Sequence, residues 1–365
     1  MGAFADRLLI AILAAAKAVG CPVSLVASWT GGGGALSYAD GPVHGQGSVA
    51  FAGSILLPDG RVMLVPTGSA VIGLFDPLTN TYSDGPAHGK GDSAFFGSSL
   101  LPDGRVMLSP FNSPVIGLFD PATNSYADGP VHGRGTGAFF GPRLLPDGRV
   151  MLVPRNSSVI GLFDPLTNTY SDGPAHGQGS IAFAGSSLLP DGRVMLAPFN
   201  SMVIGLFDPL TNSYSDGPTY GMGPWGTGTG AFFGSSLTPD GLRVILAPYD
   251  APVIGIYDIA TNTYSDGPAD GQGRFAGSQT LPDGRVMLVP FNSTVVGLFD
   301  PETNTYSNGP AHGKGSLAFR GSSLLPDGRV MLVPVNSTVI GLVSGSVPPP
   351  SGTECLLYGP YVTGL

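Results

Sequence analysis

Several residue types are scarce in this chain of 365 residues, and their scarcity narrows what the protein can be. Charged residues make up 11 % of the sequence, and the 16 lysines and arginines form no run in a chain of net charge −9. Because contacts to a nucleic-acid backbone need Lys and Arg, we expect no nucleic-acid partner. The apolar stretch Leu8–Ala16 is nine residues long, too short to cross a bilayer, so we expect no transmembrane span.

Glycine and proline are abundant instead, with 57 and 35 residues that together fill about a quarter of the chain. Both are poor in helix interiors, which excludes a helical bundle. Excess Gly and Pro without a pattern indicates disorder, but here the excess is periodic and 42 % of the residues are hydrophobic. The composition therefore predicts an ordered all-β fold.

A repeat of roughly 44 residues runs through most of the chain. The tripeptide Pro-Asp-Gly recurs once per unit, at Pro58, Pro102, Pro146, Pro190, Pro239, Pro282 and Pro326. A Gly-Pro pair recurs in the same way, at Gly41, Gly85, Gly129, Gly173, Gly217, Gly267 and Gly309. Both markers indicate seven units, and their spacing suits one blade of a β-propeller.

Each unit contains four short runs of β-type residues separated by turn signals. Pro-Asp-Gly, between the first and second runs, predicts a tight turn in which Pro sets φ and Gly takes a positive φ. Asp-Pro-x-Thr-Asn, between the third and fourth, predicts a second turn with Asn in the left-handed region. The second and third runs are apolar on both alternating faces, so both faces must be covered.

We therefore predict a seven-bladed β-propeller of four-stranded antiparallel blades, with another β-repeat architecture as the alternative. The phase of the repeat predicts how the ring closes. The chain begins with a fourth run, Leu36–Asp40, and the last unit lacks one, because Gly341–Val343 continues into Ser344–Ser346. The N-terminal strand would complete the last blade and remove an open sheet edge.

The repeat resembles the kelch-type repeats, which form β-propellers, including that of galactose-oxidase-like proteins. Leu-Leu-Pro-Asp-Gly-Arg-Val-Met-Leu is similar to a hairpin of that group. Phe75 and Tyr82 match its aromatic pair, and the same spacing recurs at Phe119/Tyr126, Phe163/Tyr170, Phe207/Tyr214, Tyr257/Tyr264 and Phe299/Tyr306. The Gly-Gly pair usual after the second run is replaced, as by Val65-Pro66, so the resemblance is to a variant of the family.

The two ends of the chain lie outside the repeat. We divide the sequence into residues 1–34, a short helix and a Gly-rich linker; 35–346, the propeller; and 347–365, a Pro-rich tail. Residues 5–19 favour a helix packed on the propeller or on a neighbouring subunit, and the alternative is a cleaved secretion signal. Cys21 and Cys355 lie one in each tail; they either form a disulfide, which implies an oxidising compartment, or stay unlinked.

All the histidines share one position in the unit, in Gly-Pro-x-His-Gly: His44, His88, His132, His176 and His312. A partial ring of histidines could hold a metal ion. We favour a structural role, in which each His hydrogen-bonds the backbone of the neighbouring blade. Tyr220 and Asp270 replace His in two units, which weakens a symmetric metal ring.

Aromatic residues mark the candidate binding positions. The connection into the fifth unit is six residues longer than the others and carries Tyr220 and Trp225. The turns after the second runs carry Phe111, Phe199, Tyr249 and Phe291, which we expect on the same face. Exposed aromatic rings on a rigid scaffold stack on sugars or anchor protein partners. The alternative is that the insert is a neutral loop and the phenylalanines seal the blade junctions.

An arginine follows nearly every Pro-Asp-Gly turn, as Arg61 does. We interpret these arginines as partners of the aspartates on one rim of the ring, with capture of an anionic ligand as the alternative.

The sequence offers little support for catalysis. Glu occurs only at Glu302 and Glu354, and no Ser lies in a nucleophile elbow. Copper chemistry of the galactose-oxidase type needs a Cys–Tyr cofactor in the propeller, and no Cys lies in a repeat. We therefore expect no enzyme and no cofactor.

We expect a structural or protein-interaction propeller, attached or self-assembled through residues 1–34. Uniform repeats and Gly/Pro/Ser-rich loops favour an extracellular setting or the surface of a virion or similar particle. The alternative is a glycan-binding propeller that uses the aromatic residues of the fifth unit.

Overall fold

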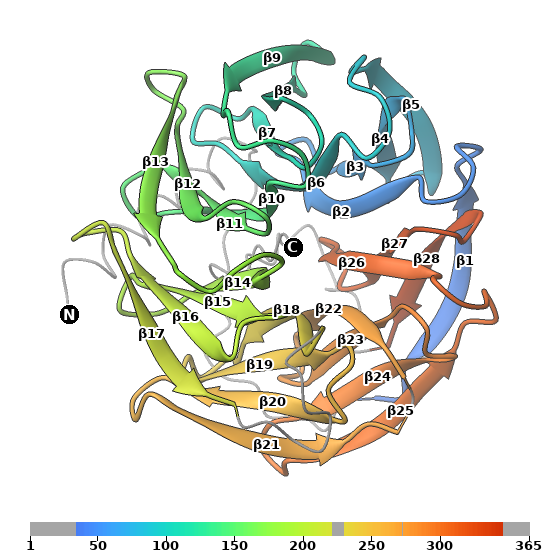
Figure 1. Ribbon diagram of the computed structural model, residues 1–365. Coiled ribbons are helices and arrows are strands. Elements are labelled where there is room, and N and C mark those ends of the chain that lie inside the picture. Colours follow the sequence, from blue (N-terminus) through green and yellow to red (C-terminus); the bar gives the residue numbers. More distant parts are fainter. Residues whose placement is uncertain (1–33, 221–229, 272, 346–365) are drawn as a thin grey trace, which may run out of the picture.

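Seven four-stranded sheets surround a central axis in the computed structural model, which describes residues 34–220, 230–271 and 273–345 (Figure 1). Every strand pair is antiparallel, so the predicted seven-bladed all-β propeller is confirmed. The described ranges contain no helix. The helix predicted near the N-terminus falls within residues 1–33, which lie outside them.

Six of the blades are built from four consecutive strands each, ordered from the axis outwards (Figure 1). Blade 1 holds β2 (Phe51–Leu56), β3 (Val62–Pro66), β4 (Val71–Asp76) and β5 (Thr81–Ala87). Blade 2 holds β6 (Phe95–Leu100), β7 (Val106–Pro110), β8 (Val115–Asp120) and β9 (Ser125–Val131). Blade 3 holds β10 (Phe139–Leu144), β11 (Val150–Pro154), β12 (Val159–Asp164) and β13 (Thr169–Ala175).

The next three blades repeat this order. Blade 4 holds β14 (Phe183–Leu188), β15 (Val194–Pro198), β16 (Val203–Asp208) and β17 (Ser213–Thr219). Blade 5 holds β18 (Phe232–Leu237), β19 (Arg243–Pro248), β20 (Val253–Asp258) and β21 (Thr263–Ala269). Blade 6 holds β22 (Phe275–Thr280), β23 (Val286–Pro290), β24 (Val295–Asp300) and β25 (Thr305–Ala311).

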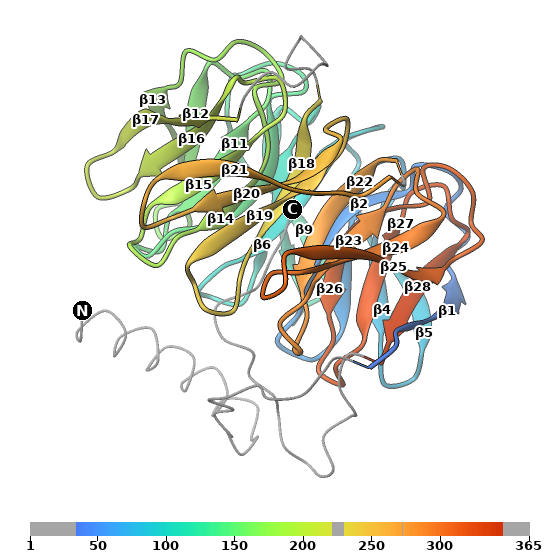
Figure 2. The same ribbon diagram turned by 90° about the horizontal axis from the view of Figure 1, so that it is seen from below.

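Blade 7 combines both ends of the described chain. It holds β26 (Phe319–Leu324), β27 (Val330–Pro334) and β28 (Val339–Ser344), and its outer strand is β1 (Ser37–Val43). In both views β1 lies beside β28, and Tyr38 is paired with Val343 (Figures 1 and 2). The strand extends beyond the predicted Leu36–Asp40 because it continues through the Gly-Pro pair.

The Gly-Pro pair does not end the fourth strand, as the sequence had suggested. In β5, Gly85 and Pro86 lie inside the strand, at a bulge opposite the step from Val71 to Gly73. An outer strand has one unpaired edge, so a residue without an N–H can be accommodated there, most easily at a bulge.

The two turn predictions are confirmed. Gly60 closes the Pro-Asp-Gly turn with φ +89°, and its N–H donates to the Leu57 carbonyl at 3.0 Å. Asn80 closes the Asp-Pro-x-Thr-Asn turn with φ +53°, and Asp76 caps that turn by accepting a hydrogen bond from the Leu78 N–H at 2.8 Å. Asn reaches this region at lower cost than most other residues with a side chain.

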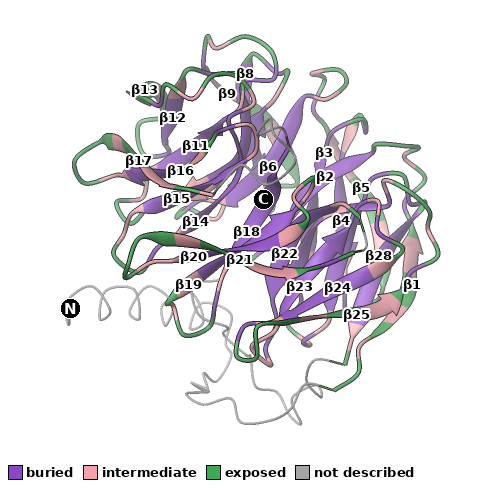
Figure 3. Cartoon of the chain, turned by 60° about the horizontal axis from the view of Figure 1, so that its bottom comes forward, coloured by how far each residue is buried: buried purple, intermediate pink, exposed green. Residues whose placement is uncertain are grey.

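The core lies between neighbouring blades. Ile72 and Leu74 of blade 1 pack in one cluster with Phe95, Val106 and Phe119 of blade 2. The third strand carries a Gly at its centre, as in Gly73, because an added Cβ would lie 2.9 Å from the Phe51 ring. Figure 3 shows the resulting pattern: the first three strands of each blade are largely buried, whereas the outer strands, such as β5, and the turns and loops are more exposed.

Antiparallel pairing places the connections on two faces of the ring. The tight-turn face carries the Pro-Asp-Gly and Asp-Pro-x-Thr-Asn turns. The loop face carries the turns between second and third strands, such as 67–70, and the loops between blades, such as 44–50.

Candidate functional site

Two positions of the repeat meet at the axis on the loop face. One is the second residue of each inner strand: Ala52, Phe96, Phe140, Ala184, Phe233, Ala276 and Arg320. The other is the residue that follows each second strand: Thr67, Phe111, Arg155, Phe199, Tyr249, Phe291 and Val335. These positions differ from blade to blade, whereas the residues around them are nearly identical.

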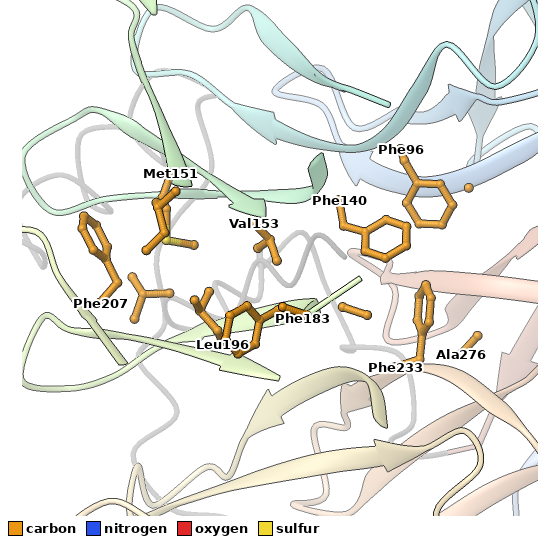
Figure 4. Packing of buried hydrophobic residues seen from close by; sticks show 14 of the residues in the cluster. Phe96, Phe140, Met151, Val153, Phe183, Leu196, Phe207, Phe233 and Ala276 are labelled. Atoms are coloured by element: carbon orange, nitrogen blue, oxygen red, sulfur yellow. The ribbon is translucent and has the colours of Figure 1, made fainter. Parts of the chain in front are cut away.

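Seven aromatic rings from these positions form one continuous group, which we call the axial aromatic cluster: Phe96, Phe111, Phe140, Phe199, Phe233, Tyr249 and Phe291. Figure 4 shows Phe96, Phe140 and Phe233 pointing toward one another from three inner strands. The ring centroids of Phe96 and Phe140 are 4.7 Å apart, and those of Phe140 and Phe233 are 5.5 Å apart. Such distances are typical of favourable aromatic pairs.

Four members of the cluster are buried, namely Phe96, Phe140, Phe233 and Phe291, whereas Phe111, Phe199 and Tyr249 are open to solvent on one side. Phe96, Phe140 and Phe233 are 5–7 % exposed, whereas Phe111 and Tyr249 are half-buried. The cluster is therefore a packed floor with accessible ring edges, on blades 2 to 6.

Three arginines lie over these rings. The guanidinium of Arg320 is 4.6 Å from the ring centroid of Phe291, and it also covers Phe96 and Phe233. Arg155 lies 5.0 Å from the Phe111 centroid and 5.3 Å from that of Phe140. These are cation–π distances.

The third arginine, Arg274, differs from the other two because it forms an ion pair. Arg274 lies 4.8 Å from the Tyr249 centroid and forms an ion pair of 2.5 Å with Asp250, which raises the pKa of Arg274. Burial lowers the pKa of Arg320, to about 10, and lowers that of Arg155. Arg320 therefore remains charged at neutral pH.

The predicted aromatic residues are divided between two places. The structure brings Phe111, Phe199, Tyr249 and Phe291 together in the axial aromatic cluster. Tyr220 instead lies at the junction of blades 4 and 5, where its hydroxyl donates to the Ser201 carbonyl at 2.8 Å. Burial there raises its pKa to about 12. Trp225, Cys21 and Cys355 lie outside the described residues.

Tyr220 occupies the position that histidine has in five other loops, the junction histidines His44, His88, His132, His176 and His312. Each Nε2 lies 2.8–2.9 Å from a Ser carbonyl, and each Nδ1 accepts a backbone N–H. The pattern assigns the proton to Nε2. The carbonyl belongs to the blade that the loop has just left, so the expected partner in the neighbouring blade is wrong.

The neighbouring blade contacts the other side of the imidazole. The His44 ring lies 5.5 Å from Phe51 and 6.2 Å from Tyr82, both in blade 1, while its hydrogen bond goes to Ser337 in blade 7. The loop between two blades is short, so the imidazole stays close to the blade that the loop has just left. The histidine therefore contacts the next blade by packing and not by a hydrogen bond. Desolvation lowers the pKa of His132 and of His312.

The arginines of the tight-turn face pair locally. Arg61 binds Asp59 of its own turn at 2.6 Å, and Arg329 also donates to the Pro77 carbonyl of the next blade at 2.8 Å. The Arg–Asp interpretation of this rim agrees with these contacts. Pairs this exposed contribute little each.

Sequence reasoning missed Phe96, Phe140, Phe233, Arg155, Arg274 and Arg320. The signal was present, because aligning the seven units shows where Ala is replaced by Phe or Arg beside nearly constant neighbours. What the alignment cannot show is that these positions converge, because that follows from closing the ring.

The described residues contain neither a metal-binding cluster nor a helix that could span a membrane. No group of three or more His, Cys, Asp or Glu side chains in those ranges could hold a metal ion. No helix in the same ranges has the length and apolar composition needed to span a bilayer.

Comparisons with known proteins connect the chain to others by fold alone. No family model matches the sequence, and no curated protein does, so the kelch resemblance stays a prediction. A streptogramin B lyase structure superposes with a TM-score of 0.68 at 15 % identity, covering 85 % of this chain and 97 % of the lyase. A catalytically inactive virginiamycin B lyase from Staphylococcus aureus with quinupristin gives 0.69 at 14 % identity, covering 85 % and 99 %.

Two further structures have other roles. A fungal alcohol oxidase of the AA5 family, in complex with copper, gives a TM-score of 0.65 at 15 % identity, covering 90 % of this chain and 79 % of the oxidase. The extracellular domain of a putative hybrid two-component system from B. thetaiotaomicron gives 0.66 at 8 % identity, covering 84 % and 39 %.

These neighbours correct the expectation that the chain is not an enzyme. The propellers that it resembles include lyases and an oxidase, so catalysis occurs on this fold. Motifs of other enzyme classes are missing from the sequence, but their absence does not exclude catalysis. A propeller supplies its functional groups from several blades, and no local motif reports them.

Proposed function

We propose that the protein binds a partner through the axial aromatic cluster and the arginines over it. The observation behind the proposal is where the blades differ from one another in sequence. In a ring of nearly identical blades, two positions that change in chemistry from blade to blade converge at the axis of one face. Packing alone does not require large side chains there, because three blades have Ala as the second residue of the inner strand.

The chemistry of the surface favours a protein segment as the partner. Aromatic residues and arginine are the anchors that dominate the energy of protein interfaces, and they work best at the centre of a patch. Here the accessible edges of Phe111, Phe199 and Tyr249 surround the buried floor, with Arg155 and Arg320 beside them.

A glycan is the second candidate, and the same ring edges support it. Aromatic rings on a rigid scaffold also stack on sugars. In this version the sugar stacks on Tyr249, Phe111 and Phe199, while Phe291, predicted as a binding residue, is buried against Tyr249. Tyr220 contributes to the blade junction, where its hydroxyl already has a partner.

A library of displayed peptides tests the first candidate, and a glycan array tests the second. The variant Phe111→Thr/Phe199→Thr introduces the residue that blade 1 carries at this position, Thr67. We expect the wild type to enrich a peptide family that the double variant does not bind. If the wild type binds glycans that the double variant does not bind, the ligand is a sugar and not a peptide.

The control is Leu78→Ala, which changes an exposed residue of the tight-turn face that is 92 % exposed. It should retain all binding, and thermal melts should show both variants folded. Ligands that bind the wild type and the double variant equally, or none in either screen, would contradict the proposal.

Attachment or self-assembly through residues 1–34 and an extracellular or virion setting stay predictions. Residues 1–33 lie outside the described part of the chain. Mass spectrometry of the intact chain from its native source would show the particle or fraction that contains it, and whether its first residues are retained.

A further inference from the structure

The distribution of positive charge singles out the axis. Eleven of the lysines and arginines in the described ranges pair with an aspartate: Arg61, Lys90, Arg105, Arg134, Arg149, Arg193, Arg243, Arg274, Arg285, Lys314 and Arg329. Arg143, an inner-strand residue, donates to the Ser186 carbonyl. Arg155 and Arg320 pair with no carboxylate of a described residue, and both lie on the axial aromatic cluster.

These two guanidiniums lie against aromatic rings. The Nε atom of each is buried without a hydrogen-bond partner among the described residues. Each residue keeps part of its surface accessible to solvent. Removing a charge from water is costly, and contact with aromatic faces recovers only part of that cost.

The fold itself does not need either arginine. Three blades have Ala where blade 7 has Arg320, and the position of Arg155 is filled by Phe, Tyr, Thr or Val elsewhere. The seven sheets keep the same strand order with each of these residues. Two arginines that the architecture can omit, each without a carboxylate partner among the described residues, indicate a role in recognition.

We propose that Arg155 and Arg320 bind a carboxylate whose attached apolar group packs on the axial aromatic cluster. This inference rests on the proposed function and specifies the chemistry of its partner: an acidic residue, or a chain-end carboxylate, beside an aromatic or apolar side chain. A guanidinium stacked on a ring keeps its N–H edge free to hold both oxygens of a carboxylate.

The net charge of the chain supports a ligand with one carboxylate. At −9, the molecule repels polyanions at long range. The local charge at the axis is positive, because Arg274 is balanced by Asp250 while Arg155 and Arg320 are not balanced by any described carboxylate. A partner with a single carboxylate can pair with these arginines and is repelled least by the net negative charge of the molecule.

Matched probes separate the carboxylate from the apolar group. N-acetyltryptophan and its neutral amide share one indole body, and they represent a chain-end carboxylate. A blocked Asp-Trp dipeptide and its Asn-Trp counterpart represent a side-chain carboxylate. We expect at least one acid to bind the full chain about tenfold more tightly than its neutral partner in calorimetric titrations. The pair that shows the preference identifies the source of the carboxylate.

The variants Arg320→Ala and Arg155→Thr introduce residues that other blades carry, so each should fold. Both should lower the affinity for the acid toward that for the amide. Arg105→Ala, on the tight-turn face, removes an equal charge and should leave the preference intact.

The outcomes distinguish this inference from the proposed function. Equal binding of acid and amide, lost in Phe111→Thr/Phe199→Thr, would overturn the carboxylate and keep the aromatic surface. A preference that survives Arg320→Ala combined with Arg155→Thr would also overturn it. Absence of binding by every probe, with peptides still enriched in the display screen, would reject the carboxylate alone.

Discussion

The two faces of the ring are made from one repeat, yet they differ in how closely the blades agree. On the tight-turn face Pro-Asp-Gly occurs in every unit, because the backbone there needs a positive φ at Gly60 and its equivalents. On the loop face the axial positions carry Ala, Phe, Tyr, Thr, Val or Arg. Where the backbone dictates the residue, the blades are alike. Where the backbone does not dictate the residue, the side chains can differ between blades and can bind a partner.

The largest test of this comparison removes an entire strand. A chain that starts after Val43 loses β1 and leaves β28 as an open edge in blade 7. We expect it to aggregate or to lose most of its free energy of unfolding, which for a typical domain is about 5–15 kcal/mol. A chain that starts at Gly34 is the control, and circular dichroism with size-exclusion chromatography compares them. Equal melting temperatures would show that the ring does not depend on β1.

A smaller effect is expected where inner strands touch below the axial aromatic cluster. An added Cβ at Gly185 would lie 2.8 Å from the Gly234 Cα, at φ +111°. Because backbone cannot give way easily, Gly185→Ala should cost about 3 kcal/mol. Gly45→Ala has a similar φ sign but open space around it, and should cost about 1 kcal/mol. Denaturant unfolding measures both, and equal losses would refute close approach as the cause.

The junction histidines predict a pH dependence. His132 and His312 have pKa values below the usual 6.5, because burial disfavours the charged ring and the nearby Arg134 and Lys314 add to this. A group with a lowered folded pKa binds a proton more readily when unfolded. Stability should therefore be complete above about pH 6.5 and fall as the pH drops through the folded pKa values.

Tyrosine provides the matched variant, because Tyr220 makes the same carbonyl contact without titrating in this range. His132→Tyr/His312→Tyr should lose less free energy of unfolding between about pH 7 and about pH 5 than the wild type does. The aspartates with lowered pKa, such as Asp40, act only below about pH 4. An unchanged slope in the variant would exclude the histidines as its source.

The smallest effect belongs to the tight-turn face. Asn80 has φ +53°, so Asn80→Ala should lose about 1 kcal/mol, while Asn80→Gly should stay within a few tenths. Thermal melts of the two variants decide the point, and an alanine variant as stable as the glycine variant would show that φ carries no cost here.

Much of the fold could be predicted because its determinants are local. Pro-Asp-Gly and Asp-Pro-x-Thr-Asn each set their own backbone, and the apolar second and third runs require cover on both faces. The outer strands were harder. The predicted fourth run, Leu36–Asp40 in the N-terminal strand, stops before the Gly-Pro pair, but a bulge on an edge strand accommodates such a pair, as at Gly85 and Pro86.

The candidate site could be predicted only in part. Phe111, Phe199, Tyr249 and Phe291 were predicted to be exposed turn residues, and this is wrong for Phe291, which is buried. That all four join one cluster depends on the curvature of the ring. Arg320 and Phe96 are 224 positions apart in the chain, yet one lies over the other. No local pattern reports such a pair.

By itself, the sequence determined the number of blades, the strand order within each blade and both turn types, because a repeat with its own turn residues sets these within about 44 positions. Only the tertiary structure decided which variable residues meet. Closing the ring brings the second residue of every inner strand to one axis, so residues that are dispersed along the chain become a single aromatic and cationic surface.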